Sequence, residues 1–140
     1  MSRHEARATA LQMLFQMDVG ENPPETALFT LEEAALSEAD GEFAKELAFG
    51  TQEKLAELDT LIRKYSYQWD VDRLANVDRN VLRLALYEMF FVENIPHSVT
   101  IDEAIELAKL FSTEESKAFI NGVLDTIYKN HLENKEQPEV

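Results

Sequence analysis

Apolar residues fill most positions from Val77 to Val92, and after the polar residues Asp78, Arg79 and Asn80 of its first turn the main interruptions are Arg83 and Glu88. A helix with this pattern is apolar around its whole circumference, which is typical of a helix buried at the centre of a bundle. It should end before Pro96, because proline disfavours helical geometry at the preceding residue and has no amide hydrogen to donate. We therefore predict a buried central helix over this segment.

Two more helices are predicted after the proline. Thr100 with Glu103 has the spacing of a capping box, in which each side chain satisfies one amide at the start of a helix. Ser112 with Glu115 has the same spacing. Apolar residues then recur at helical spacing after each box. They are Ile101, Ala104, Ile105, Ala108 and Phe111 after the first box, and Ile120, Val123, Leu124 and Ile127 after the second.

The N-terminal half also shows helical periodicity. Apolar spacing predicts a first helix from about His4 to Asp18. Pro24 is well placed to open a second helix, which should end near Leu36. Ser37 can cap a third helical element, in which Gly50 marks a break or kink. The whole chain is thus expected to be helical.

Composition limits the class of protein. The 140 residues, 45% of them hydrophobic, suit one folded domain, which we expect to span residues 1–130, followed by a disordered acidic tail over 131–140. The absence of cysteine excludes disulfides and thiolate chemistry, which suits a reducing cytoplasm. No apolar run approaches the length of a membrane span, and the N-terminus lacks a signal-peptide core. We expect a soluble, cytoplasmic protein without membrane contact.

Motifs for catalysis are missing. The four glycines form no phosphate-binding loop, and the three histidines are too scattered for a metal site. His4 and Glu5 lack the second histidine of a zinc-binding helix. We therefore predict a protein that is not an enzyme and that holds neither a cofactor nor a metal.

Four segments resemble the NusB family of transcription antitermination factors. DRNVLRLALYE, IPHSVTIDEAIELAK and KAFINGVLD are similar to its C-terminal helices, and RHEARATALQMLFQ is similar to its first helix. The resemblance covers roughly residues 2 to 130. It implies an all-α fold, a compact bundle of about seven helices in two helical sub-bundles. It also implies a non-catalytic protein that binds boxA-type single-stranded RNA together with NusE, a ribosomal small-subunit protein, and keeps RNA polymerase processive within the elongation complex.

Net charge works against RNA binding. The formal charge is −14, and affinity for nucleic acid rests largely on neutralising phosphates. The acidic excess is concentrated, however, because Val19 to Thr60 holds 11 of the 27 acidic residues but 2 of the 13 basic ones. A face built from the first helix and the start of the last helix therefore stays neutral or weakly basic. We expect weak RNA affinity in the absence of a partner.

Basic residues at the start of the first helix are candidates for RNA contacts. Arg3 and Arg7 lie one helical turn apart, with His4 beside them. Cations here oppose the helix dipole by a few tenths to ~1 kcal/mol, so phosphate binding is one reason for their presence. The other interpretation is that they are solvated charges offset by Glu5.

The start of the last helix supplies the other RNA-binding candidates. Lys117 offers a phosphate contact, and Phe119 a platform on which a base of single-stranded RNA can stack. Spacing alone favours a core position for Phe119, whereas the resemblance favours the platform. Glu115 lies at the edge of the same face, where its charge repels phosphate.

Candidate partner contacts follow from the resemblance. Asp72 and Asp78 align with acidic positions of the family that face NusE, although without the resemblance both would be helix-capping aspartates. Arg79 and Phe111 complete the candidate partner-binding set.

Two other functions stay open. One is a protein-only helical adaptor or homodimer without RNA binding, which the acidic charge favours. The other is the RNA-binding domain of an RNA cytosine methyltransferase, against which stand the missing cofactor loop, the missing cysteine and a chain that ends near residue 140.

Overall fold

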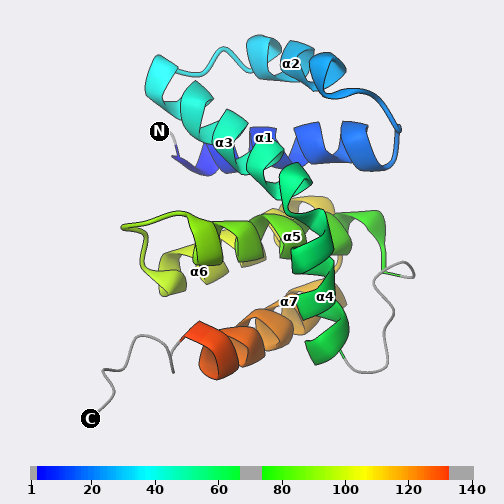
Figure 1. Cartoon of the computed structure of the whole chain (residues 1–140), viewed down its shortest axis with the longest axis vertical. Coiled ribbons are helices and arrows are strands. Elements are labelled where there is room, and N and C mark those ends of the chain that lie inside the picture. The colour runs from blue at the N-terminus through cyan, green and yellow to red at the C-terminus, as the bar shows by residue number, and fades with distance from the viewer. Residues whose placement is uncertain (1–2, 67–73, 133–140) are drawn as a thin grey trace. The chain divides into compact units, whose positions relative to one another are not determined.

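The computed structural model describes residues 3–66 and 74–132, which are helical apart from short connections and contain no strand (Figure 1). The helices are α1 (Arg3–Asp18), α2 (Pro24–Glu33), α3 (Glu38–Glu53), α4 (Leu55–Tyr65), α5 (Asn76–Phe91), α6 (His97–Phe111) and α7 (Glu114–Ile127), followed by the π-helical turn η2 (Tyr128–Leu132). The predicted all-α class is confirmed. Asp72 and residues 133–140 of the tail predicted over 131–140 lie outside the described residues, whereas His131 and Leu132, the first two residues of that tail, belong to η2.

The chain divides into two compact units, residues 1–55 and 56–140. In the first unit α1 packs against both α2 and α3. Pro24 opens α2, and the Ser37 hydroxyl caps α3 by accepting a hydrogen bond from the Asp40 amide at 3.2 Å, as predicted. Helix α2 ends at Glu33, before the predicted Leu36, because Ala35 adopts a left-handed backbone with φ 51°.

The expected break at Gly50 is not at that residue. Helix α3 continues through Gly50 to Glu53, and the chain leaves helical geometry at Lys54, whose ψ is 16°. Glycine costs only ~1 kcal/mol in a helix interior, so flanking residues that pack well can carry the helix through it. The buried side chains Leu47, Ala48 and Thr51 surround Gly50 along this helix.

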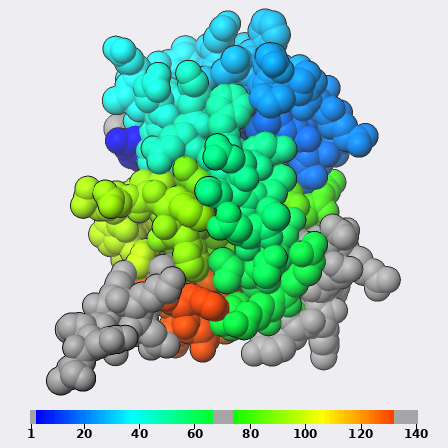
Figure 2. Space-filling view, viewed as in Figure 1, coloured from blue at the N-terminus to red at the C-terminus, as the bar shows by residue number. Residues whose placement is uncertain are grey.

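The second unit is built around α5, which packs against α6 and α7. Every residue from Asn80 to Met89 is buried, which confirms the predicted central helix. Helix α4 lies at the surface of this unit and presents exposed side chains such as Arg63 and Lys64 (Figure 2). No helix in the described ranges is both long enough and apolar enough to cross a membrane.

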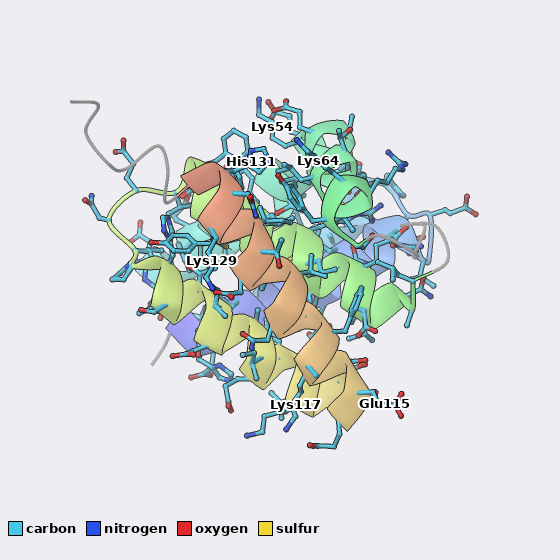
Figure 3. All side chains as sticks on the ribbon, turned by 90° about the horizontal axis from the view of Figure 1, so that it is seen from below. Lys54, Lys64, Glu115, Lys117, Lys129 and His131 are labelled. Atoms are coloured by element: carbon cyan, nitrogen blue, oxygen red, sulfur yellow. The ribbon has the colours of Figure 1, made fainter. Side chains whose placement is uncertain are left out.

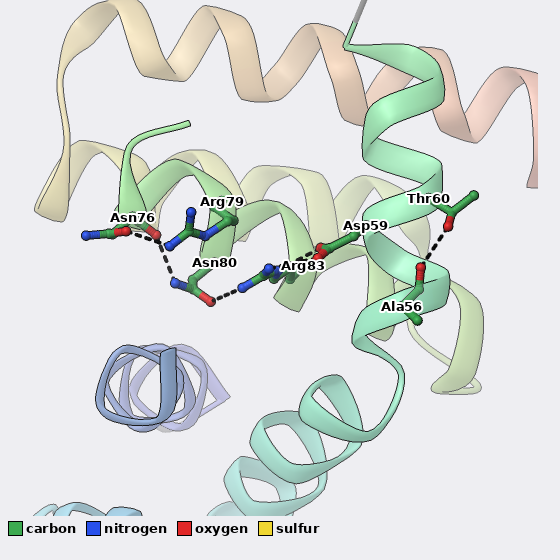
Figure 4. A network of polar contacts seen from close by, with 7 residues as sticks. All are labelled: Ala56, Asp59, Thr60, Asn76, Arg79, Asn80 and Arg83. Atoms are coloured by element: carbon green, nitrogen blue, oxygen red, sulfur yellow. Dashed lines mark hydrogen bonds and ion pairs between the residues drawn. The ribbon is translucent and has the colours of Figure 1, made fainter. Parts of the chain in front are cut away.

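Both polar interruptions of α5 are buried and have polar partners on neighbouring helices. The Arg83 guanidinium donates to both oxygens of Asp59 on α4, each at 2.8 Å, and it also contacts Asn80 (Figure 4). The carboxylate of Glu88 accepts a hydrogen bond from the Thr100 hydroxyl on α6. Charged groups in an apolar helix are tolerated only when they are paired in this way. The two pairs therefore attach α4 and α6 to the central helix.

The predicted capping box at Thr100 is wrong. Helix α6 begins at His97, with Pro96 as its N-cap residue, so Thr100 lies inside the first turn and is buried. The fixed φ of proline, −59° here, suits the entry to a helix. The Thr100 hydroxyl instead donates a hydrogen bond to Glu88, because a buried carboxylate needs a hydrogen-bond donor.

Candidate functional site

The start of α7 carries the C-terminal group of candidate site residues. Thr113 has an extended backbone and is the N-cap, and its hydroxyl oxygen accepts a hydrogen bond from the Ser116 amide at 3.2 Å. The predicted box of Ser112 with Glu115 is therefore wrong by one residue. Glu114 and Glu115 occupy the first turn, where carboxylates interact favourably with the helix dipole.

Ser112 is not a cap because its hydroxyl is used elsewhere. It donates to Asp78 Oδ1 at 2.9 Å, and the Ser116 hydroxyl donates to Asp78 Oδ2 at 2.9 Å. Asp78 lies in the first turn of α5 and is 9% exposed. One carboxylate thus joins the start of α5 to the α6–α7 turn. The sequence did not indicate that these two serines bond to Asp78, because Asp78 lies 34 residues before Ser112 and 38 residues before Ser116.

A hollow of about 340 Å³ opens at this junction. It brings together residues assigned separately from the sequence: Asp78 from the partner set, and Glu115 and Phe119 from the RNA set. Phe119 is half-buried and Glu115 is exposed. The complete lining is Leu74, Ala75, Asp78, Thr113, Glu115, Ser116 and Phe119. An aromatic ring beside hydroxyl and carboxylate groups offers both a stacking surface and hydrogen-bond partners.

Lys117 does not line this hollow. It lies about 200° around the helix from both Glu115 and Phe119, since successive residues are about 100° apart. Figure 3 shows Glu115 and Lys117 pointing in different directions from the start of α7, whereas Lys129 and His131 lie toward its other end. Lys117 pairs with Glu114 at 2.9 Å and is 25% exposed.

The ion pair changes the electrostatics of the helix start. The hydrogen bond from Lys117 and its positive charge lower the pKa of Glu114, and Lys109 adds a smaller effect in the same direction. Because this carboxyl has a lowered pKa in the folded state, the pair stabilises the fold above the unfolded pKa and loses its effect as the pH falls through the folded value. At neutral pH Glu114 is ionised and lies beside Lys117, so its negative charge partly offsets that of the lysine.

The N-terminal candidates lie on α1 in the first unit. Arg3 and His4 are exposed, whereas Arg7 is 5% exposed. Both guanidinium groups lie over the Phe43 ring of α3, at 4.0 Å for Arg3 and 5.4 Å for Arg7, measured to the ring centroid. Cation–π contact gives these arginines a structural role that the pattern within α1 did not indicate.

The remaining partner candidates are Arg79 and Phe111. Arg79 is half-buried in the first turn of α5 and donates to the Asn76 side chain at 2.6 Å. Phe111 ends α6 and is 37% exposed, and its neighbour Leu110 is more exposed. Sequence reasoning missed Leu110, although two adjacent exposed apolar residues at a helix end are a usual sign of a contact surface.

A larger hollow of about 1010 Å³ lies between the α5–α6 loop and the end of α7. None of the predicted site residues line it, and its lining includes the acidic Glu93 and Asp125. Carboxylates repel phosphate, so size alone does not make this the better nucleic-acid site. Within the described ranges, no group of histidine and acidic side chains is arranged to hold a metal ion.

Comparison with known proteins decides the family. The sequence model of the NusB family matches residues 4–129. The chain belongs to the NusB family. The match extends from the first turn of α1 into η2, so it includes the candidate residues of both units other than Arg3.

Relatives within the NusB family agree in sequence, length and fold. Transcription antitermination protein NusB of Desulforamulus reducens is 46% identical over 98% of this chain and 94% of its own length. The solved structure of T. maritima NusB has a TM-score of 0.86 and 40% identity, with 96% of each chain covered. A crystal structure of antitermination factors NusB and NusE in complex with double-stranded RNA matches with a TM-score of 0.85 and 31% identity, over 92% of this chain and 97% of that chain.

Proposed function

We propose that this chain is a non-catalytic transcription antitermination factor. It binds boxA-type single-stranded RNA together with NusE and acts with the RNA polymerase elongation complex in the cytoplasm. Membership of the NusB family supports the proposal, and the likeness to NusB in the structure with NusE and double-stranded RNA supports binding of RNA together with NusE. The observation that carries it is the hollow at the start of α7, which half-buried Phe119 lines together with the exposed residues Thr113 and Glu115.

The hollow suits a base of single-stranded RNA for two reasons. A half-buried ring is held in place and still has exposed surface, and base–aromatic stacking contributes about 1–3 kcal/mol. The exposed side chains of Thr113 and Glu115 line the same hollow and offer oxygen atoms to base edges. The double-stranded form of the same RNA buries these edges, so it should bind less well.

A titration of boxA-type RNA tests the proposal. With Arg3, His4 and Lys117 as candidate phosphate contacts, about three phosphates are neutralised, and log Kd should change with log salt by a slope of about 2. A scrambled RNA of equal length and the double-stranded form are the controls. Equal affinity for all three RNAs, or no binding at low salt, would contradict the proposal and favour the protein-only adaptor.

Charge changes at the start of α7 should have opposite effects. We expect Glu115→Gln to tighten RNA binding by about threefold, because it removes a negative charge from the hollow. Its cost in stability should be below ~1 kcal/mol, since Thr113 caps the helix. Lys117→Gln should weaken binding. Fluorescence anisotropy of labelled RNA measures both effects.

Glu106→Gln is the matched control for the change in net charge. Glu106 is an exposed residue of α6 that does not line the hollow. If Glu106→Gln tightens RNA binding as much as Glu115→Gln does, the effect is one of total charge and the RNA does not contact the hollow.

The two arginines of α1 should separate into different roles. Arg3 is exposed, so Arg3→Ala should weaken RNA binding and lower the salt slope by ~0.7 with little loss of stability. Arg7 is buried, so Arg7→Ala should lower the free energy of unfolding by about 1–2 kcal/mol through lost packing and cation–π contact with Phe43. Chemical denaturation and RNA titration of each variant measure the two roles. Equal stability of both variants would show that the burial of Arg7 contributes little to the fold, since Arg3 and Arg7 both contact Phe43.

A further inference from the structure

Asp78 occupies an unusual position for a residue at a candidate interface. Both of its oxygens already accept hydrogen bonds from within the unit, from Ser112 and Ser116 at 2.9 Å each. These serines lie on either side of the α6–α7 turn, and their own oxygen atoms are 2.8 Å apart. Hydrogen bonds to a charged acceptor are among the stronger ones, so this carboxylate fixes the turn against the start of α5.

The same carboxylate borders the hollow at the start of α7. Asp78 and Phe119 both line it, and Ser116 connects them through the first turn of the helix. The Thr113 cap also depends on the position of Ser116, because the Thr113 hydroxyl oxygen accepts a hydrogen bond from the Ser116 amide. A change in the placement of Asp78 therefore moves the first turn of α7, and with it the side chains that face the hollow.

We propose that Asp78 is a positioning residue that couples the first turn of α5 to the RNA-contacting first turn of α7 through Ser112 and Ser116. A protein that docks on the start of α5, next to Arg79, then changes RNA affinity without touching RNA. A connected set of hydrogen bonds between two surfaces is one physical route for such coupling, and the hydroxyl–carboxylate cluster is such a set. The inference rests on the proposed function, and it gives Asp78 a role other than direct contact with the partner.

The two roles of Asp78 can be separated by comparing alanine with asparagine. An asparagine amide can keep both contacts, because a serine hydroxyl donates to its oxygen and another accepts from its nitrogen. Asp78→Asn should therefore retain RNA affinity within about twofold, whereas Asp78→Ala should lose about threefold to tenfold. Ser116→Ala should lose affinity as Asp78→Ala does, and the double variant should be no worse than either single variant.

Hydrogen exchange of the free protein gives a readout that does not depend on RNA. The amides of Ser116 and Lys117 bond to Thr113, so they should exchange faster in Asp78→Ala than in the wild type and be restored in Asp78→Asn. Asp59→Asn is the matched control, since it removes a half-buried, hydrogen-bonded carboxylate of α4, in the same unit. It should lower stability and leave both the exchange at these amides and RNA affinity unchanged.

The outcomes distinguish this inference from the proposed function. If the wild-type chain binds no RNA, the proposed function fails, but accelerated exchange in Asp78→Ala still supports the positioning role. If the wild type binds RNA and Asp78→Ala binds equally well, with exchange unchanged, the positioning role is overturned. It is also overturned if Asp78→Asn loses as much RNA affinity as Asp78→Ala, because charge and not placement then matters. Should Asp78→Ala fail to fold, the same comparison is made with Ser116→Ala and Ser112→Ala.

Discussion

Asp59→Ala should lower the free energy of unfolding by about 3–5 kcal/mol and the midpoint of thermal unfolding by about 10 °C or more. The reason is the pair that it breaks. Arg83 donates to both Asp59 oxygens at 2.8 Å, and the two side chains are 8% and 14% exposed. Without Asp59, the Arg83 guanidinium stays buried in the central helix and loses both hydrogen bonds to a carboxylate, while its 3.3 Å contact with Asn80 is with a neutral amide oxygen. Urea denaturation followed by circular dichroism measures the loss.

A double variant shows whether the cost comes from the unpaired charge. Replacing both partners with apolar residues, Asp59→Leu with Arg83→Met, should recover most of the stability, because desolvation of the charges is then avoided. Thr60→Ala on the next position of α4 is the control, since Thr60 is exposed and bonds only to the backbone of its own helix at 2.8 Å. A loss below ~1 kcal/mol for Asp59→Ala would mean that the pair is effectively solvated.

Phe119→Ala should weaken RNA binding by about 5- to 150-fold, the range expected when one stacked base loses its aromatic partner. The ring lines the hollow beside Glu115 and is half-buried, so it can be removed with a smaller loss of stability than a core phenylalanine. Anisotropy titration at constant salt measures the affinity, and thermal unfolding of the same sample measures the stability.

Phe29→Ala is the matched control for this change. Phe29 is the most exposed of the exposed large apolar side chains in the described ranges, and it lies on α2 in the first unit. It should leave RNA affinity within twofold. If Phe119→Ala leaves RNA affinity equally unchanged while lowering stability, Phe119 is a core residue, as its spacing alone favours.

The elements of the fold followed from the sequence where burial alone decides them. The apolar run from Val77 to Val92 predicted the central helix, because a helix apolar on every side has no stable place except the interior. Local rules failed at the helix starts. Thr100 and Ser112 have the spacing of caps, yet each hydroxyl serves a buried carboxylate on α5. At both positions the hydroxyl bonds to a carboxylate that is distant in the sequence and does not cap its own helix. A pattern of a few neighbouring residues cannot reveal such a partner.

The candidate site was predicted as a list of residues but not as an arrangement. Phe119 and Glu115 do share a face, as residues four apart on a helix must. Lys117 is two residues away from both and faces elsewhere, which the helical period already required. The contact of Arg7 with Phe43 lies beyond local reasoning, because α1 and α3 are brought together by the tertiary fold.

Titration of boxA-type RNA with and without NusE tests the central claim most directly. The net charge of −14 and the pairing of Lys117 with Glu114 leave few cations for phosphate, so the chain alone should bind weakly at moderate salt. Saturating NusE should tighten binding by at least tenfold, and the RNA should tighten NusE binding by the same factor because the coupling is reciprocal. Equal RNA affinity with and without NusE would contradict the account.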